Sequence, residues 1–202
     1  QAIRTLHENN VEGLIVIGGN GSLTGAHILA TKFNFPVVGI PATIDNDING
    51  VDLSLGADTA VNVALDALDK IRDTAGSHNR LFFIEVMGRD AGFIALKSGI
   101  AAGAEAILIP EVQHQVENLR AYLDKDFKRK KSSNIIIVAE GDEEGGAFAI
   151  ADKVKNDFSE YEVRVSVLGY IQRGGTPSAY DRVSASKLGY AAVEALMDDQ
   201  KS

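Results

Sequence analysis

Residues 13–40 read GLIVIGGNGSLTGAHILATKFNFPVVGI. A β-branched apolar run at 13–17 is followed by a glycine cluster, a segment of helical period at 22–33 and a second apolar run at 35–40. This order predicts a strand, a helix and a second strand parallel to the first, because parallel strands need a crossover connection of this kind. The stretch therefore indicates an α/β fold built from βαβ units.

The same alternation continues to the end of the chain. All of the apolar runs, including the two above, are short and nearly all apolar, as is typical of strands covered on both faces. Between them, apolar residues recur at spacings of three and four, which predicts helices. No Pro/Gly-rich linker separates the elements, so any division into domains must be a fold-back. The further expected strands are 81–87, 106–110, 134–140 and 161–169, and the further expected helices are 56–75, 90–101, 115–130, 146–157 and 181–198.

Composition narrows the class of protein. The 202 residues carry a formal net charge of −8 and include no cysteine. The negative charge argues against nucleic-acid binding, because the overall field repels a phosphate backbone. A chain without cysteine has no disulfide and suits a reducing cytosol. The most apolar stretch, 91–110, is interrupted by Lys97 and Glu105, so we expect no membrane span and a soluble, cytoplasmic protein.

The glycine cluster is the first candidate binding site. Gly19, Gly21 and Gly25 lie between the first strand and the helix, whose first turn carries Ser22 and Thr24. Such a turn lets phosphate approach the backbone and the free N–H groups of a helix start. The GxGxxxG spacing differs from both common nucleotide fingerprints. A tight turn capped by Ser22 is the structural alternative.

The second candidate is TIDND, within the loop 41–52 that follows the strand 35–40. Asp and Asn often shape such loops through their own side chains. Alternatively, one of Asp45 and Asp47 accepts a proton from a hydroxyl group while the other holds a divalent cation. Ligands bind at the carboxyl ends of strands in open α/β sheets, so the position of this loop favours the second interpretation.

Two arginines complete the set of candidates. Arg89 follows a strand in EVMGRDAG, where a guanidinium group could stabilise the charge of a transferring phosphoryl group. Surface pairing with Asp90 or Glu85 is its alternative. Arg173 precedes two glycines in LGYIQRGG, where it could bind phosphate or lie in a solvated turn.

Taken in order, GGNGS, PATIDND, SHNR, EVMGRDAG, IPE, VAEG and LGYIQRGGTPSAYDR resemble the phosphofructokinase family from Gly13 to Leu196. Seven ordered motifs are far more specific than any one of them. The resemblance implies two Rossmann-like, three-layer α/β/α domains with mostly parallel sheets. Residues 1–57 and 170–202 would bind ATP, and 58–169 would bind fructose 6-phosphate. The implied glycolytic reaction moves the γ-phosphoryl group of ATP to the sugar 1-hydroxyl, with Mg²⁺.

The resemblance also implies a role for individual residues. Asp45 is the catalytic base, while Thr43 and Arg89 stabilise the phosphoryl group and contact the substrate. Asp47 holds the magnesium ion, and Asn20 stands where the family usually has an aspartate near the metal. The match to the ATP loop consists of Gly19, Asn20, Gly21, Ser22 and Gly25. The matches to sugar-phosphate contacts are Arg80, Met87, Gly88, Glu140, Arg164, Tyr170 and Arg173. The matches to a nucleotide effector site are Arg72, Glu105 and Lys131.

Two of these matches carry further consequences. Arg80 and Arg164 match residues that the family supplies from a neighbouring subunit, which implies a homotetramer with shared active sites. Tyr170 replaces a histidine that is common in bacterial members; a phenol donates a hydrogen bond but does not become cationic.

The family leaves two alternatives to an ATP-dependent enzyme. A pyrophosphate-dependent branch fills the ATP space with bulky residues, and the small Gly21 and Ala42 favour ATP here, although Ala42 replaces the commoner glycine. The other alternative is a regulatory subunit without turnover, suggested by Asn20. The family's opening strand before Gln1 and its closing segment after Ser202 are absent from this sequence, so we expect a fragment of a longer protein.

Overall fold

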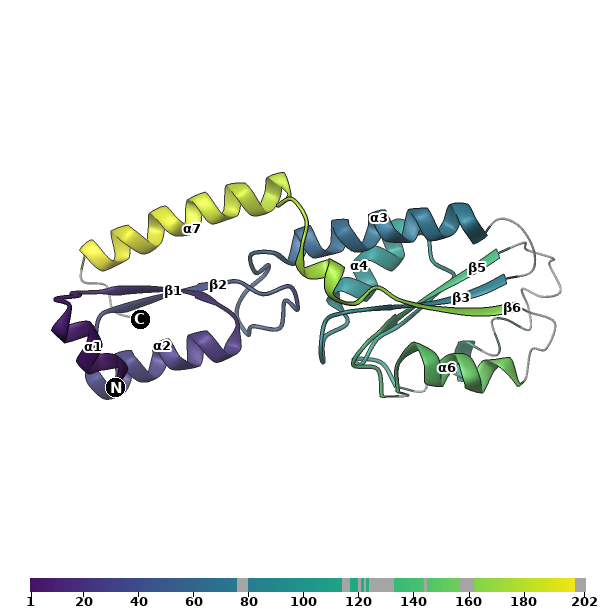
Figure 1. The fold of residues 1–202 in the computed structure, drawn as a ribbon, viewed down its shortest axis with the longest axis horizontal. Coiled ribbons are helices and arrows are strands. Elements are labelled where there is room, and N and C mark those ends of the chain that lie inside the picture. The colour runs from purple at the N-terminus through teal and green to yellow at the C-terminus, as the bar shows by residue number, and fades with distance from the viewer. Residues whose placement is uncertain are drawn as a thin grey trace. The chain divides into compact units, whose positions relative to one another are not determined.

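The structure is a computed structural model that divides into two compact units (Figure 1). The first unit comprises Gln1–Thr43, Ile48–Asp58 and Pro177–Ser202, and the second comprises Ile44–Asp47 and Thr59–Thr176. The residues that the structure describes are 1–75, 80–113, 117–119, 121, 123, 133–143, 145–156 and 162–198.

Two segments, and the single residue Asp58, lie in a different unit from the one expected. Residues 44–47 and 170–176 both belong to the second unit. Ile44 packs against the core of that unit. Residues 170–176 contact that unit in part through Gln172, whose side chain accepts the backbone N–H of Met87.

The first unit is built on the βαβ motif predicted from residues 13–40. Strands β1 (Leu14–Gly18) and β2 (Val37–Pro41) are parallel, and α2 (Asn20–Phe33) connects them. The C-cap residue of α2 is Asn34, whose left-handed backbone (φ 49°) suits asparagine. Ala26, Phe35 and Val37 form the buried core against α2 and α1 (Ala2–Glu8).

Helix α7 (Ala179–Met197) returns to the first unit and packs against β2. Ser178 caps its N-terminus by accepting a hydrogen bond from Asp181 N. The Asp181 carboxylate in turn accepts the N–H of Gly56 at 2.9 Å, just before α3 (Ala57–Ala75). The cap therefore ties the start of α7 to a loop far away in the sequence.

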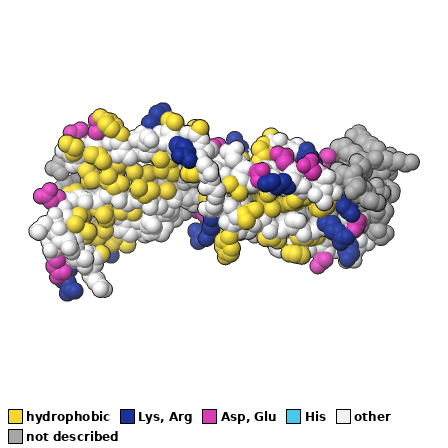
Figure 2. All heavy atoms as spheres, turned by 45° about the horizontal axis from the view of Figure 1, so that its top comes forward, with side chains coloured by type: hydrophobic (Ala, Val, Ile, Leu, Met, Phe, Trp, Pro, Cys, Tyr) yellow, Lys and Arg dark blue, Asp and Glu magenta, His cyan; other side chains and the backbone are white. Residues whose placement is uncertain are grey.

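Apolar side chains remain on the surface of the first unit, where yellow side chains gather around the α7 region in Figure 2. Ile17 of β1 is 63% exposed, and Val193 and Met197 of α7 are also exposed. The expectation that every strand is covered on both faces is therefore wrong for β1 within the described residues.

The second unit is a parallel four-stranded sheet in the order β4-β5-β3-β6. Helices α3 and α4 contribute to the core on one face, and α6 packs on the other, which gives the expected three layers (Figure 1). The bounds are β3 Arg80–Val86, α4 Phe93–Ala102, β4 Ala106–Leu108, β5 Ser133–Ala139, α6 Gly146–Lys155 and β6 Glu162–Val167.

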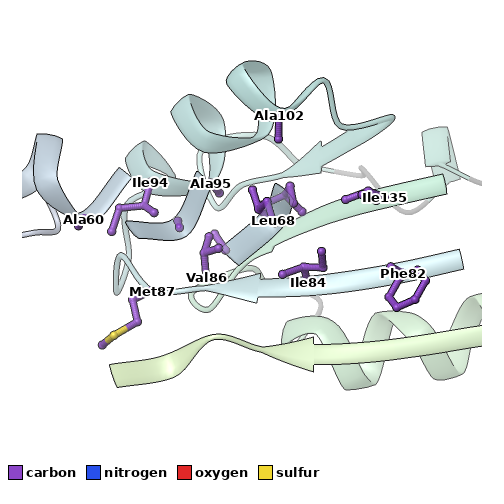
Figure 3. Close-up of a cluster of buried hydrophobic side chains, with 13 residues drawn as sticks. Ala60, Leu68, Phe82, Ile84, Val86, Met87, Ile94, Ala95, Ala102 and Ile135 are labelled. Atoms are coloured by element: carbon purple, nitrogen blue, oxygen red, sulfur yellow. The ribbon is translucent and has the colours of Figure 1, made fainter. Parts of the chain in front are cut away.

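The central strand β3 is covered on both faces, as its sequence predicts. Phe82, Ile84 and Val86 point into the cluster shown in Figure 3, whereas Leu81 and Phe83 belong to the cluster on the other face. Successive side chains of a strand point to opposite faces, so an unbroken apolar run is needed to fill both cores.

Most predicted elements differ from the observed ones by a few residues at one or both ends. The strand expected at 161–169 ends at Val167 and is followed by a 3-10 helix, η1 (Gly169–Arg173), which the sequence pattern did not predict. The helix expected at 90–101 begins later, at Phe93, because a turn occupies the residues before it. Most of the helix expected at 115–130 lies outside the described residues.

Within the described residues, no helix combines the length and the apolar character that crossing a membrane requires.

Candidate functional site

The glycine turn joins β1 to α2 in the first unit. Gly19 rather than Ser22 is the N-cap of α2, and no side chain in the described part of the chain caps this helix. Instead, Ser22 packs against Gly18, where an added Cβ would lie 2.7 Å from the serine Oγ. Apart from the neighbouring residues and the backbone of α2 itself, no described atom lies within 4 Å of a Cβ added at Gly21 or Gly25. The turn therefore offers backbone N–H groups and open space, as phosphate binding requires.

The PAT segment lies beside this turn in the same unit. Ala42 N donates to Gly18 O at 3.0 Å, and a Cβ added at Gly19 would lie 3.5 Å from Thr43 Cβ. Ser54 Oγ donates to Thr43 O at 2.7 Å and fixes the loop from its other side. The structure thus brings Thr43 together with the predicted ATP loop.

The two carboxylates of TIDND differ in exposure. Asp45 is buried at 8% exposed, whereas the side chain of Asp47 is exposed. Asn46 between them has a left-handed backbone (φ 52°), which asparagine tolerates better than most residues. The loop therefore gives the two acids different surroundings, as a division of chemical roles would require.

The Met87–Asp90 turn follows β3 in the second unit. Gly88 has φ 144° and Arg89 has φ 53°, so two successive residues adopt conformations that L side chains rarely take. Met87 is buried at the end of the cluster in Figure 3, whereas Arg89 is exposed. Within the described residues, the Arg89 guanidinium group forms no ion pair, so the expected alternative of surface pairing with Asp90 or Glu85 is not found there.

The side chain of Glu140 holds this turn by accepting hydrogen bonds from the backbone of the turn. Its Oε1 accepts the N–H of Arg89 at 2.8 Å and that of Gly88 at 3.3 Å. Gly141 lies against the same turn, because a Cβ added there would be 1.9 Å from Arg89 O. The predicted sugar contact Glu140 therefore also fixes the backbone that carries Arg89.

Tyr170 and Arg173 lie together on η1. The Arg173 Cζ is 5.2 Å from the centre of the Tyr170 ring, which is a cation-π contact. Tyr170 is 78% exposed, so the pair is presented to solvent. The tyrosine thus supplies a surface on which the predicted phosphate-binding arginine rests.

Arg80 and Arg164 share one carboxylate. Arg80 Nε contacts Glu162 Oε2 at 2.9 Å, and Arg164 contacts the other oxygen of Glu162. The register of β3 and β6 places Arg80 opposite Glu162. The structure therefore brings together the two arginines for which the sequence predicts a shared phosphate.

Arg72 and Glu105 of the predicted effector site line one small cavity of about 100 Å³, together with Gly103 and Ile135. The third predicted member, Lys131, lies outside the described residues. In the part of the chain that is described, no group of three His, Cys, Asp or Glu side chains is arranged to hold a metal ion.

The sequence reasoning missed Gln172, Glu162 and Gly141, each of which contacts a predicted site residue. Their only sequence signal is adjacency: Gln172 precedes Arg173, Glu162 lies two residues before Arg164, and Gly141 follows Glu140.

A family model described as Phosphofructokinase matches residues 1–196. The chain is 52% identical over 201 residues to "ATP-dependent 6-phosphofructokinase 2" of Bacteroides thetaiotaomicron, covering 100% of this chain and 62% of that protein. It is 51% identical over 197 residues to "ATP-dependent 6-phosphofructokinase 1" of Thermus thermophilus, covering 98% and 61%. The chain thus spans about three fifths of the length of these relatives.

Solved structures agree with the resemblance. Phosphofructokinase from Saccharomyces cerevisiae superposes with a TM-score of 0.85 at 34% identity, covering 95% of this chain and 29% of that one. The pyrophosphate-dependent phosphofructokinase of Marinobacter aquaeolei gives 0.83 at 28% identity, covering 98% and 55%. The resemblance and fold class drawn from the sequence are confirmed: the chain belongs to the phosphofructokinase family.

Proposed function

We propose that the full-length protein is an ATP-dependent 6-phosphofructokinase, which transfers the γ-phosphoryl group of ATP to the 1-hydroxyl of fructose 6-phosphate. The observation that carries this proposal is the TIDND loop, with Asp45 buried and Asp47 exposed, in a chain whose relatives of this name are 51% to 54% identical. Within the proposal, the first unit binds ATP and the second binds fructose 6-phosphate.

Asp45 is the proposed catalytic base. A buried carboxylate that meets a sugar hydroxyl accepts its proton with little competition from water. Phosphoryl transfer depends mainly on positioning and charge neutralisation, for which Thr43 and Arg89 are the proposed donors. The exposed guanidinium group of Arg89 is available for this role.

Asp47 and Asn20 are the proposed ligands of Mg²⁺. Both offer the hard oxygen atoms that Mg²⁺ prefers, and the Asp47 carboxylate is exposed. Mg²⁺ commonly takes one or two carboxylates and completes its shell with water and phosphate oxygens, so it needs no cluster of three acids. When bound, it neutralises negative charge on the phosphates of ATP.

The sugar phosphate would be held by the turn and by η1. Met87, Gly88 and Glu140 are the proposed contacts to the sugar, and Arg173, resting on Tyr170, is the proposed contact to its 6-phosphate. The paired Arg80 and Arg164 would serve the phosphate of a neighbouring subunit in a homotetramer. The cavity at Arg72 and Glu105, with Lys131, would bind a nucleotide effector, and the enzyme would act in the cytoplasm.

The test compares Asp45→Asn with Asp66→Asn in the full-length protein, measuring formation of fructose 1,6-bisphosphate. Asp66 is an exposed carboxylate paired with Lys70 on α3 and serves as the matched control. We expect Asp45→Asn to lower kcat by about a hundredfold or more, and Asp66→Asn to leave it unchanged. A much smaller loss in Asp45→Asn would show that the base is wrongly assigned.

Pyrophosphate as donor is the second candidate, because Ala42 replaces the glycine that is commoner in ATP-dependent members and because the chain is similar to the Marinobacter aquaeolei structure. The same assay with each donor separates the two: turnover with pyrophosphate alone would overturn the ATP assignment. The open space at Gly21 supports the larger donor. Binding of both substrates without turnover would instead identify a regulatory subunit, the alternative suggested by Asn20.

A further inference from the structure

Gln172 is a buried polar residue in the middle of an exposed segment. Its relative exposure is 1%, whereas Tyr170 on the same short helix η1 is 78% exposed and Arg173 is also exposed. A buried amide side chain must find hydrogen-bond partners, because leaving its polar atoms unpaired costs free energy. The partners of Gln172 therefore show what its burial achieves.

The amide of Gln172 uses one acceptor and one donor on two separate segments. Its Oε1 accepts the N–H of Met87 at 3.2 Å, and its Nε2 donates to Gly169 O at 3.0 Å. Met87 opens the turn that carries Gly88 and Arg89, and Gly169 opens η1. A single side chain thus joins the end of β3 to the start of η1.

Other hydrogen bonds hold the segments on either side of this junction. The backbone joins the same segments through Leu168 N, which donates to Glu85 O at 3.0 Å, before the turn begins. Glu140 holds the next two N–H groups, those of Gly88 and Arg89. The N–H of Met87 donates to the Gln172 side chain. The three successive N–H groups of Met87, Gly88 and Arg89 therefore all have side-chain acceptors.

We propose that Gln172 is a positioning residue for fructose 6-phosphate: it holds the Met87–Arg89 turn at a fixed distance from Arg173. This inference rests on the function proposed above, in which the turn contacts the sugar and Arg173 contacts its phosphate. A primary amide is the side chain that supplies both hydrogen bonds, since leucine supplies neither and a glutamate carboxylate keeps only the acceptor.

The test uses Gln172→Leu and Gln172→Glu in the full-length protein, with Ser98→Ala as the matched control. Ser98 is fully buried, and its Oγ donates to Ile94 O within α4, so the control also removes a buried hydrogen bond. We expect Gln172→Leu to raise KM for fructose 6-phosphate on the order of tenfold, with KM for ATP unchanged. Gln172→Glu should give a smaller rise, and Ser98→Ala none.

Hydrogen–deuterium exchange at residues 87–89 gives a second readout that needs no turnover. We expect exchange there to be faster in Gln172→Leu than in the unsubstituted protein, and unchanged in Ser98→Ala. If the unsubstituted protein shows no turnover, the proposed function fails, and exchange alone decides the positioning role. If Gln172→Leu does not fold, Gln172→Glu decides by the same two measurements. Unchanged exchange, or equal changes in both KM values, would overturn the proposal.

Discussion

The two strand-to-helix turns proposed to meet the substrates are built in opposite ways. The turn after β1 has open space at Gly21 and Gly25, and Gly19 caps its helix without a side chain. The Met87–Asp90 turn after β3 is enclosed, because Glu140, Gln172 and Gly141 all contact its backbone. The first turn leaves room for a ligand at the backbone, whereas the second fixes the direction of a side chain, Arg89.

The largest expected effect is on the side chain that the enclosed turn presents. We expect Arg89→Ala to lower kcat of the full-length enzyme by about a hundredfold to a thousandfold, because a fixed donor to the transferring phosphoryl group is lost. Arg4→Ala, which removes an exposed arginine paired with Glu8, is the control and should leave kcat unchanged. Equal kcat values in the two variants would show that Arg89 does not act on the phosphoryl group and that the enclosed turn does not serve to position it.

The next effect concerns the packing of that turn. Gly141→Ala places a Cβ where the carbonyl oxygen of Arg89 now lies, so the backbone must move. We expect it to lower the free energy of unfolding by about 3 kcal/mol, at the upper end of overpacking effects. Urea unfolding followed by circular dichroism measures this change, and a loss below about 1 kcal/mol would show that the turn adapts.

A smaller effect is expected at Glu140. In Glu140→Ala the N–H groups of Gly88 and Arg89 lose their acceptor, and we expect a loss of about 1 kcal/mol, since water replaces part of the bond at this partly exposed site. Glu140→Gln keeps an amide oxygen as acceptor and should recover most of the stability. Thermal melting of the Glu140→Ala and Glu140→Gln variants checks this. Equal melting temperatures would show that the amide oxygen restores nothing and that the loss of stability comes from the loss of the negative charge.

The smallest effect has the opposite sign and lies at the open turn. Gly25 is inside α2, and apart from its neighbours and the helix's own backbone an added Cβ meets no described atom within 4 Å. We expect Gly25→Ala to raise the free energy of unfolding by about 0.5 to 1 kcal/mol, because alanine favours the helix over glycine. If Gly25→Ala destabilises as Gly141→Ala does, the contrast between the two turns is wrong.

Local pattern was sufficient to predict most strands and helices. Phe82, Phe83 and Ile84 lie in an unbroken apolar run, and this run became a strand buried on both faces. The 3-10 helix η1 was missed because five residues are too few to show a period, and its bond from Gln172 to Met87 joins residues that are far apart in the sequence. Periodicity carries no information about such long-range pairs.

The sequence predicted which residues form the candidate site, but not how buried each one is or what it contacts. The spacing of Asp45 and Asp47 marked both as candidates, yet only the structure distinguishes the buried acid from the exposed one. The neighbouring Ile44 packs against the second core, a tertiary contact that the loop sequence does not encode. Glu140 was expected to contact a ligand, and its hydrogen bonds to backbone N–H groups were not foreseen.

The strand order of the second unit has a consequence for synthesis on the ribosome. Strands β3 and β4 are both complete by Leu108, but they pair with β5 and not with each other. The first backbone partner of β3 in the described sheet begins at Ser133, and the second begins at Glu162. Pairing across such a separation is slow to form. The growing chain therefore carries the apolar strand of Phe82 and Phe83 without a strand partner until β5 has emerged.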